Sequence, residues 1–514
     1  MMHSGGALVS RPIIALLALI AACPSVLAQT RPPNVLIIVG DDHSYDVLGA
    51  YGSKLAHTPS LDRLAAQGVR FDRAYCNTPI CSPSRQSFLC GRYPQTVGVT
   101  LLSHALDDSA YTLAHRLREA GYRTGAFGKM HFNSNRSHGF EVFKPESAYH
   151  AWDRSHPHRP LPEGLQILPP VFRPFQDPAR VWLNGINVPF GRYDDDMPGT
   201  WYARQAIDFI KDNKDRPFFA QIGFNEPHSP FWFPVDFKDR FRPADMTVPK
   251  PGPEDAGQIP KVFADLTYAD KQGIIASYYT SAAFLDSNVG RVLAAIDSLG
   301  LADNTLVIYL GDNGYHLGQH GRFEKHCFFD RAVRVPLVMR LPGRIKPGST
   351  AALVEFVDLV PTVLDYLGLP ADPKTPPPRD LHGHSLRPIV EARRDKVRDA
   401  VFSEYRHTEE AMVRTDRYKL IYRTIRALTD WYEPVQPPTG RGVRLYDEIN
   451  DPEEMHDIAA DPANAGVVSD LLDRLAAFYH RFPPRGETPP QNLSREDFLD
   501  WAIAQRNPLT APAK

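Results

Sequence analysis

The sequence has few cysteines, no block of basic residues and no second long apolar run. Five cysteines in 514 residues cannot build a disulfide scaffold, so a hydrophobic core must stabilise the fold. The formal net charge is −2 and no cluster of lysine and arginine stands out, so nucleic acid is not an expected partner. Beyond the N-terminal segment no run is apolar enough to span a membrane.

What is present is typical of a large globular protein. Hydrophobic residues make up 43% and charged residues 23% of the chain, and its length allows more than one domain. The 48 prolines favour long ordered loops over long helices. No internal repeat is evident, so a repeat architecture is not expected.

The N-terminus has the pattern of an export signal. Arg11 precedes the apolar run 12–22, and small residues precede Gln29. We therefore expect a signal peptide over residues 1–28 and a secreted or periplasmic protein. The alternative is a lipoprotein anchored through Cys23, because the residues before it resemble a bacterial lipoprotein box.

Apolar runs alternate with segments of helical spacing up to about residue 370, which predicts an α/β fold with a large, mostly parallel central sheet. The expected strands are 34–40, 70–71, 122–127, 217–223, 305–311 and 334–339. The expected helices are 58–68, 113–120, 201–211 and 271–299. Between residues 134 and 200 the periodicity is lost, and we expect a long insertion with loops.

A different pattern follows the proline-rich connector 372–379. Short strands separated by turns and one helix predict a smaller C-terminal α+β domain with an antiparallel sheet. These elements are 400–402, 411–414, 418–422, 444–447 and the helix 466–479. The predicted organisation is a signal peptide (1–28), a catalytic domain (29–385), a C-terminal subdomain (395–482) and a polar tail (483–514).

One short stretch carries the pattern of a catalytic turn. If the chain becomes helical after Pro83, Cys81 lies at a helix N-terminus, where unpaired N–H groups and the helix dipole favour an anion. Arg85 follows one helical turn later, so its guanidinium can lie near Cys81. The alternative is a buried structural cysteine, the usual state of a free thiol.

Polar side chains follow the ends of several predicted strands. In one parallel sheet such ends converge on one edge, where ligands bind. These residues are Asp41, Asp42, Lys129, His131, His228, Asp312 and Asn313. Four of them offer only oxygen ligands, without a Cys or His set at zinc spacing, which favours Ca²⁺ or Mg²⁺ over Zn²⁺.

The Cys81 stretch closely resembles the C-x-P-x-R signature of the type I, formylglycine-dependent sulfatases. Further similar motifs follow in the family's order and cover most of the chain. They are Asp41–Asp42, 128–131, 226–228, 311–314, Lys325, 445–447 and 451–452. The segment 314–321 is similar to the branch of iduronate-2-sulfatase-like and glucosamine-6-sulfatase-like enzymes. Cys90 departs from the pattern, since the family usually has Thr, Ala or Arg there.

The resemblance implies an alkaline-phosphatase-like sandwich that hydrolyses sulfate esters, in which Cys81 is oxidised to formylglycine by a maturation enzyme. The implied catalytic residues are Cys81, Arg85, Lys129, His131, His228 and Lys325. The implied ligands of Ca²⁺, with Mg²⁺ as the alternative, are Asp41, Asp42, modified Cys81, Asp312 and Asn313. Lys129, His228 and Lys325 would contact the sulfate.

The chemistry that follows from these roles is coherent. One hydroxyl of the hydrated aldehyde attacks sulfur, and His228, alone or with Lys325, protonates the leaving alcohol. His131 then removes the proton of the second hydroxyl, which expels sulfate and restores the aldehyde. An unmodified thiol has no second hydroxyl and could not reset in this way.

Sulfated carbohydrates are the expected substrates. Candidates for their recognition are His320 and the stretch 149–160, which is rich in His, Arg and aromatic residues. The first alternative function is a phosphonate monoester or phosphodiester hydrolase of the same superfamily, and the second is a non-catalytic binder of sulfated glycans. For Cys76 and Cys90, a disulfide and simple packing both stay open.

Overall fold

The computed structural model describes residues 1–3, 5–6, 31–169, 173–370 and 380–506. Residues 33–514 form one compact unit, distinct from residues 1–32. Most of the predicted export signal, including Cys23, and the whole proline-rich connector 372–379 lie outside the described residues. The predicted domain boundaries stay predictions.

The centre of this unit is an eight-stranded sheet with the strand order β10-β2-β9-β7-β1-β6-β4-β5. The middle strand β1 pairs in parallel with β7 and with β6. Only β9 runs antiparallel to its neighbours, so the predicted mostly parallel α/β sheet is confirmed. Its strands are β1 (Asn34–Gly40), β2 (Val69–Phe71), β4 (Arg123–Gly128), β5 (Val142–Lys144), β6 (Phe218–Gly223), β7 (Thr305–Gly311), β9 (Leu337–Arg340) and β10 (Gly348–Thr350).

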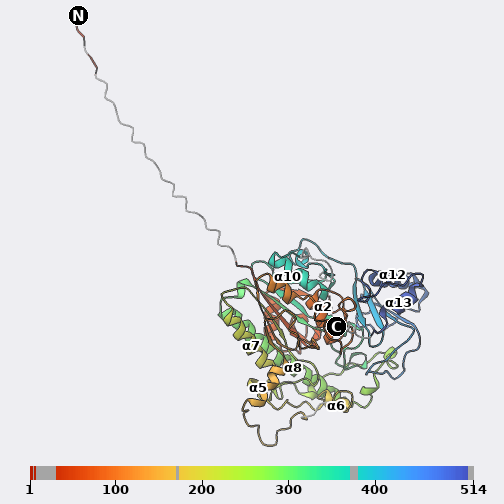
Figure 1. The fold of residues 1–514 in the computed structure, drawn as a ribbon. Helices are drawn as coiled ribbons and strands as arrows, with labels where there is room; N and C mark the ends of the chain where they lie inside the picture. The colour runs from red at the N-terminus through yellow and green to blue at the C-terminus, as the bar shows by residue number, and fades with distance from the viewer. Residues whose placement is uncertain (4, 7–30, 170–172, 371–379, 507–514) are drawn as a thin grey trace, which may run out of the picture. The chain divides into compact units, whose positions relative to one another are not determined.

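Helices cover both faces of this sheet, because β1 is apolar on both sides. Val35 and Ile37 face the core shared with α2 (Cys81–Cys90), α4 (Leu113–Glu119) and α10 (Leu359–Leu367). Leu36 and Ile38 face the core shared with α1 (Pro59–Ala66), α7 (Pro198–Asp212) and α8 (Tyr268–Ser298). The result is a three-layer sandwich, with α7 and α8 on one side of the strands and α2 and α10 on the other (Figure 1).

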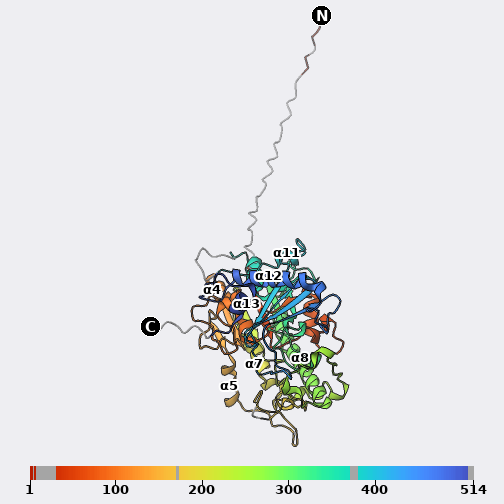
Figure 2. The ribbon, with the colours of Figure 1, turned by 90° about the vertical axis from the view of Figure 1, so that its right-hand side faces the viewer.

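Two smaller sheets complete the fold. One has the order β11-β3-β8, from Val354–Glu355, Ala74–Tyr75 and Arg334–Val335. The other is the predicted antiparallel C-terminal sheet, formed by β12 (Val401–Tyr405), β13 (Glu410–Arg414), β14 (Tyr418–Arg423) and β15 (Gly442–Asp447). Helices α12 (Ala465–Arg481) and α13 (Arg495–Ile503) share a core with it, and Figure 2 shows α12 lying across its strands.

Three local expectations differ from the structure. The predicted strand 334–339 was wrong, because Pro336 separates β8 from β9 and the two belong to different sheets. The tail after residue 483 contains α13, whose apolar face packs on α12 and the C-terminal sheet. Much of the stretch 149–160 is helical, since α5 (Glu146–Ser155) buries Tyr149 against Trp201 of α7.

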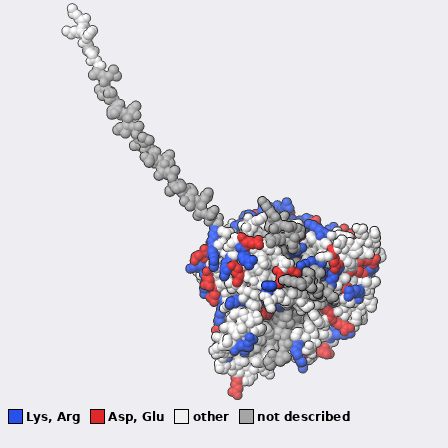
Figure 3. Space-filling model, in the orientation of Figure 1, with Lys and Arg blue, Asp and Glu red and all other residues white. Residues whose placement is uncertain are grey.

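The remaining α-helices are short, with four residues each. They are α3 (Pro94–Val97), α6 (Ala179–Trp182), α9 (Asp330–Val333) and α11 (Arg387–Val390). Across the described ranges no helix has both the length and the apolar character needed to cross a bilayer. Cations and anions are interspersed on the face shown in Figure 3, so no broad field of one sign covers it.

Candidate active site

The thiol of Cys81 lies at the start of α2, as predicted, with the helix beginning at this residue. The side chain is buried. Its Sγ lies 2.8 Å from Nζ of Lys325 and 3.7 Å from Oδ1 of Asp42. Burial and the neighbouring Asp41 carboxylate raise the pKa of the Cys81 thiol well above its ordinary value. An unmodified Cys81 would therefore be a protonated thiol, which is a poor nucleophile.

Arg85, one turn further along α2, ties three strand ends together. Its Nε donates to Oδ2 of Asp312 at 2.7 Å, after β7, and its guanidinium lies 3.3 Å from Oδ1 of Asp41, after β1. It also donates to the backbone carbonyl of Lys129, after β4. Arg85 is buried, and these paired contacts compensate its charge.

Three carboxylates converge at the ends of β1 and β7. One oxygen from each of Asp41, Asp42 and Asp312 lies within 4.8 Å of the others, all buried. Asn313 adds an amide that donates to Oδ1 of Asp42 at 2.7 Å, while its own Oδ1 is buried without a hydrogen-bond partner. Buried acids in such a cluster repel one another unless a cation compensates them, and oxygen donors suit Ca²⁺ or Mg²⁺. The residues present therefore fit a divalent metal.

The backbone around Asp42 is shaped to hold this cluster. Asp42 has a φ of 61°, in the left-handed region that few residues other than glycine adopt. Its N–H donates to Oδ1 of Asp312 at 2.9 Å, and its carbonyl accepts from the hydroxyl of Tyr278 in α8. Strain at such a residue persists only where the surroundings hold it, which is common at functional sites.

The protonation of these acids differs with their neighbours. Burial alone would raise the pKa of Asp41, but Lys129, His228 and Arg85 together hold it well below its ordinary value. Burial raises the pKa of Asp312 to about 7, against the opposing charge of Arg85. A bound divalent cation would favour the ionised form of Asp312.

Two lysines and two histidines surround Cys81. Lys129 pairs with Asp41 and Lys325 pairs with Asp42. His228 Nε2 lies 3.7 Å from Oδ2 of Asp42, and its Nδ1 is 2.7 Å from the carbonyl of Ser229. Lys129 and His131 follow β4, His228 follows β6, and Lys325 lies in the loop after β7. The structure thus contains the predicted convergence at one edge of the sheet.

The two histidines are both biased toward the neutral form. Burial lowers the pKa of His131 well below its ordinary value, and Lys129 and Arg85 lower it further. Burial also lowers the pKa of His228, where the Asp42 carboxylate opposes the shift. His131 is therefore neutral, whereas Asp42 raises the pKa of Lys325 well above its ordinary value and keeps this lysine a cation.

These groups open into a cavity of about 410 Å³, the catalytic pocket. Besides the predicted residues, its walls include Phe175, Trp182, His326, Trp431 and Tyr432. The rings of Phe175 and Trp431 stack with centroids 5.5 Å apart and planes at 15°. This aromatic rim was not predicted from the sequence. An adjacent Trp–Tyr pair in a proline-rich loop was the available signal, since exposed aromatics in loops often mark binding.

The two predicted recognition elements lie elsewhere. His320 is buried, with Nδ1 2.9 Å from Oδ1 of Asp255 and its ring stacked on Phe329 at 3.7 Å. Neither His320 nor the stretch 149–160 lines the catalytic pocket. Their roles in recognition stay predictions. Within the described residues Cys76, Cys81, Cys90 and Cys327 are free thiols.

The chain is similar in sequence to known sulfatases. The sulfatase family profile matches residues 33–369, and a profile described as N-sulphoglucosamine sulphohydrolase, C-terminal, matches residues 318–481. The N-acetylglucosamine-6-O-sulfatase of Bacteroides thetaiotaomicron is 25% identical over 90% of this chain and 89% of its own length. Human iduronate 2-sulfatase is 29% identical over 68% of this chain and 72% of its own.

A solved structure has a similar fold. The phosphonate monoester hydrolase of Agrobacterium radiobacter superposes with a TM-score of 0.71 and 25% identity, covering 87% of this chain and 96% of that one. The fold and the acidic, lysine- and histidine-lined pocket thus define an enzyme of the alkaline-phosphatase-like class. Within that class the chain belongs to the sulfatase family, and the predicted sulfuric ester hydrolase is confirmed.

Proposed function

We propose that the protein hydrolyses sulfate esters of sulfated carbohydrates, with an aldehyde hydrate made from Cys81 as nucleophile. The observation that carries the proposal is the position of Cys81 at the N-terminus of α2, beside Lys325 and next to three clustered carboxylates. The sugar sulfatases among the relatives support the substrate class.

The residues divide the work by charge and position. Asp41, Asp42, Asp312 and Asn313 would hold a divalent cation, which supplies positive charge beside the developing negative charge. Ca²⁺ is our first choice and Mg²⁺ the alternative.

The side chains around Cys81 handle the substrate and its protons. Lys129 and Lys325 bind the sulfate group and neutralise it, and Arg85 orients the modified Cys81 through its pairs with Asp41 and Asp312. His228 and Lys325 deliver a proton to the leaving alcohol. The buried, neutral His131 accepts a proton when sulfate leaves.

Two measurements test the proposal together. Mass spectrometry of the peptide that contains Cys81 should show an aldehyde in place of the thiol, provided that the maturation enzyme is present during expression. The same preparation should release sulfate from 4-nitrophenyl sulfate and from sulfated saccharides. An intact thiol combined with no sulfate release would refute the proposed function.

A phosphonate monoester or phosphodiester hydrolase is the second candidate, favoured by the structural likeness to the Agrobacterium enzyme. Phosphodiesters and sulfate monoesters carry the same single negative charge, so the lysines suit both. Turnover of matched 4-nitrophenyl esters in one preparation decides between them. A large preference for the phosphodiester would replace the sulfatase assignment.

We also propose that the protein is exported, secreted or periplasmic, with lipid anchoring through Cys23 as the alternative. The support is the residue pattern of positions 1–28, which lie almost wholly outside the described residues. The N-terminus of protein expressed in its native host separates the alternatives, because cleavage before Gln29 leaves no lipid and cleavage before Cys23 leaves a lipidated cysteine.

A further inference from the structure

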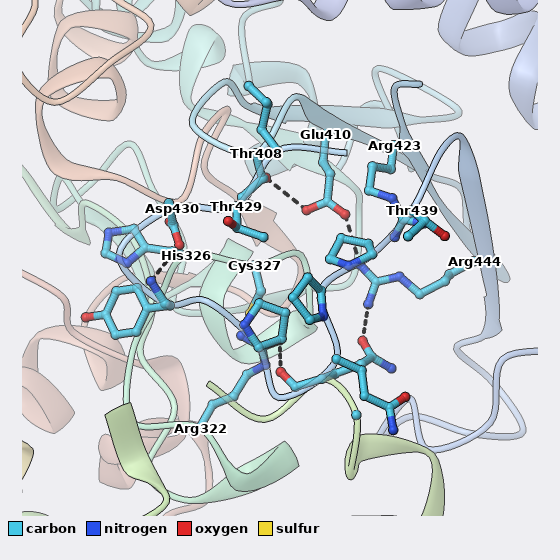
Figure 4. Close-up of a pocket in the computed structure, with 18 of the residues that line it drawn as sticks. Arg322, His326, Cys327, Thr408, Glu410, Arg423, Thr429, Asp430, Thr439 and Arg444 are labelled. Atoms are coloured by element: carbon cyan, nitrogen blue, oxygen red, sulfur yellow. Dashed lines mark hydrogen bonds and ion pairs between the residues drawn. The ribbon is translucent and has the colours of Figure 1, made fainter. Parts of the chain in front are cut away.

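A second cavity of about 680 Å³ lies beside the catalytic pocket. The two share His326 and Tyr432 as wall residues, and His326 directly follows the catalytic Lys325 in the chain. We call it the arginine cavity, because Arg322, Arg423 and Arg444 line it. Figure 4 shows these arginines approaching from separate segments, with Arg423 and Arg444 on the same side.

The walls of the arginine cavity are held by main-chain contacts. The connection from β14 to β15 pairs with the segment 257–261, where the N–H of Val435 donates to Ile259 at 3.0 Å and that of Gln436 to Gly257 at 2.9 Å. Pro260 and Pro434 form an isolated bridge in the same place. These contacts fix the loop that carries Trp431 and Tyr432, so the cavity and the aromatic rim share one support.

Two of the three arginines are already neutralised. Arg444 lies 3.3 Å from Oε1 of Glu410, and Arg322 lies 2.6 Å from Oε1 of Glu324. Arg423 is different: its Nε donates to the carbonyl of Gly440 at 3.3 Å, and no carboxylate of the described residues forms an ion pair with it. Burial lowers the pKa of Arg423, and Arg444 lowers it further against the opposing Glu410. An anion bound in the cavity would compensate the charge of Arg423.

Three carboxylates line the cavity, and each already accepts a hydrogen bond from the protein. Glu254 accepts from the N–H of Asp457 at 2.9 Å. Glu410 accepts from the hydroxyl of Thr408 at 3.0 Å and from Arg444. Asp430 accepts from the hydroxyl of Tyr405 at 2.5 Å and from the N–H of Tyr432 at 2.8 Å. The groups still able to bind a ligand are therefore Arg423 and the hydroxyl and amide groups of the wall. Such a set of donors suits an acidic sugar.

The position of Arg423 also depends on a glycine. Gly442 is its cross-strand partner in β15, and a Cβ built on Gly442 would lie 2.7 Å from Cζ of Arg423. The guanidinium thus occupies the space that a side chain at position 442 would fill. Gly442 has an ordinary backbone conformation, so an alanine there would displace the guanidinium and leave the strand intact.

We propose that the arginine cavity binds an acidic saccharide unit, bearing a carboxylate or a sulfate, next to the unit whose sulfate ester enters the catalytic pocket. Arg423 is the anion contact, and His326 and Tyr432 form the boundary between the two units. The inference rests on the proposed function for the identity of the substrate, but the binding it asserts can be measured without turnover.

The test measures binding to the full-length Cys81→Ala variant in buffer containing Ca²⁺. Calorimetric titrations use three disaccharides, in which 6-O-sulfated N-acetylglucosamine is joined to glucuronic acid, to 6-O-sulfated galactose or to galactose. We expect the two acidic partners to bind about 10–100-fold more tightly than the neutral one. The stronger of the two shows which anion the cavity prefers. Equal affinities, or no binding by any of the three, would overturn the inference.

A second variant assigns the preference to Arg423. Adding Arg423→Gln to the Cys81→Ala background should reduce the ratio of neutral to acidic Kd to about 1. The matched control is Arg417→Gln, which should keep the full ratio, because Arg417 directly precedes β14 and is ion-paired with Asp447 of β15 outside the cavity. If Arg423→Gln does not fold, Gly442→Ala replaces it with the same expectation. A ratio unchanged in the Arg423 or Gly442 variant would also overturn the inference.

This design separates the inference from the proposed function. Absence of sulfate release from every ester, with acidic binding intact and dependent on Arg423, would refute only the function. Sulfate release without any preference for acidic disaccharides would refute only the inference.

Discussion

At the residue scale, burial and neighbouring charges around Cys81 keep some groups protonated and others neutral. Lys325 keeps its proton beside Asp42, whereas burial and Lys129 keep His131 neutral. His228 lies between these extremes, because Asp42 partly offsets the effect of burial. The proposed role of His228 as the general acid is therefore the one that kinetic measurements can test most directly.

If His228 protonates the leaving alcohol, His228→Gln should lower kcat for a sugar sulfate by about 10²–10⁴-fold. The loss for 4-nitrophenyl sulfate should be far smaller, since nitrophenolate leaves without a proton. The lowered pKa of His228 also places the alkaline limb of the wild-type kcat/KM profile below about pH 6.5, and the variant should lack this limb. Equal losses on both substrates would contradict the role.

The acidic cluster predicts a metal requirement. Treatment with EDTA should lower both Tm and sulfate release, and added Ca²⁺ should restore both. At 100 times its Kd, Ca²⁺ should stabilise the folded protein by about 2.7 kcal/mol. The matched variant is Asp312→Asn, which removes one of the three clustered carboxylates. Its Tm should respond much less to Ca²⁺. A wild-type Tm that is indifferent to EDTA, Ca²⁺ and Mg²⁺ would contradict the metal site.

At the scale of elements, a long-range contact replaces the local cap of helix α1. The N-cap residue of α1, Thr58, makes no side-chain capping hydrogen bond. Asp286 of α8 supplies the cap instead, accepting from the N–H of Ser60 at 3.0 Å and of Leu61 at 2.8 Å. The acceptor for the first N–H groups of this helix, which covers β9, thus lies more than two hundred positions away. No local sequence signal could indicate such a cap.

Asp286→Ala should therefore destabilise the protein by about 1–3 kcal/mol, because the N–H groups of Ser60 and Leu61 lose their acceptor. Asp286→Asn keeps an acceptor oxygen and should cost less. Chemical denaturation with linear extrapolation measures both. Equal costs would show that packing, and not the hydrogen bonds, determines the effect.

The same residue predicts a pH dependence. Burial raises the pKa of Asp286 to about 6, so between about pH 4 and 6 the folded protein holds a proton that the unfolded chain has released. Its contribution to stability consequently falls as the pH rises through this window, by up to about 1.4 kcal/mol per unit. Asp286→Asn should lose this part of the slope in a series of Tm measurements from pH 4 to 7. An unchanged slope would contradict the shift.

At the scale of the molecule, a buried lysine joins the C-terminal sheet to the catalytic part. Lys419 of β14 is fully buried, and its Nζ pairs with Glu454, lies 3.3 Å from Asp330 at the start of α9 and 3.1 Å from the carbonyl of Phe328. Residues 328–330 closely follow Lys325 in the chain. The lysine thus compensates buried acids from two parts of the fold.

Lys419→Met should destabilise the protein by about 3–5 kcal/mol, since it leaves Asp330, Glu448 and Glu454 without their central cation. Thermal unfolding and the temperature at which sulfate release is lost should shift together. The control is Lys396→Met, an exposed lysine paired with Asp399, which should leave Tm unchanged. A shift confined to the C-terminal sheet, with activity retained, would contradict the coupling.

Much of the site could be predicted because it follows strand ends. The runs 34–40 and 305–311 are buried strands, and the polar residues after them lie at one edge of a parallel sheet by topology alone. The features that could not be predicted are those that no rule of sheet topology covers. Pro336 divides one apolar run between two sheets, α13 lies in a polar tail, and Phe175 meets Trp431 across more than two hundred residues.

The sequence by itself determined the chemical groups and the sheet that carries them, because strand periodicity and motif order are local properties of the chain. Only the tertiary structure decided which groups face Cys81 and which pair elsewhere: His320 lies against Asp255 and Phe329, while Trp431 and Tyr432 border the catalytic pocket. It also decided that Arg423 lacks a carboxylate partner among the described residues. Contacts of this kind depend on loops that the whole fold brings together, so their free energies cannot be inferred from any single segment of the sequence.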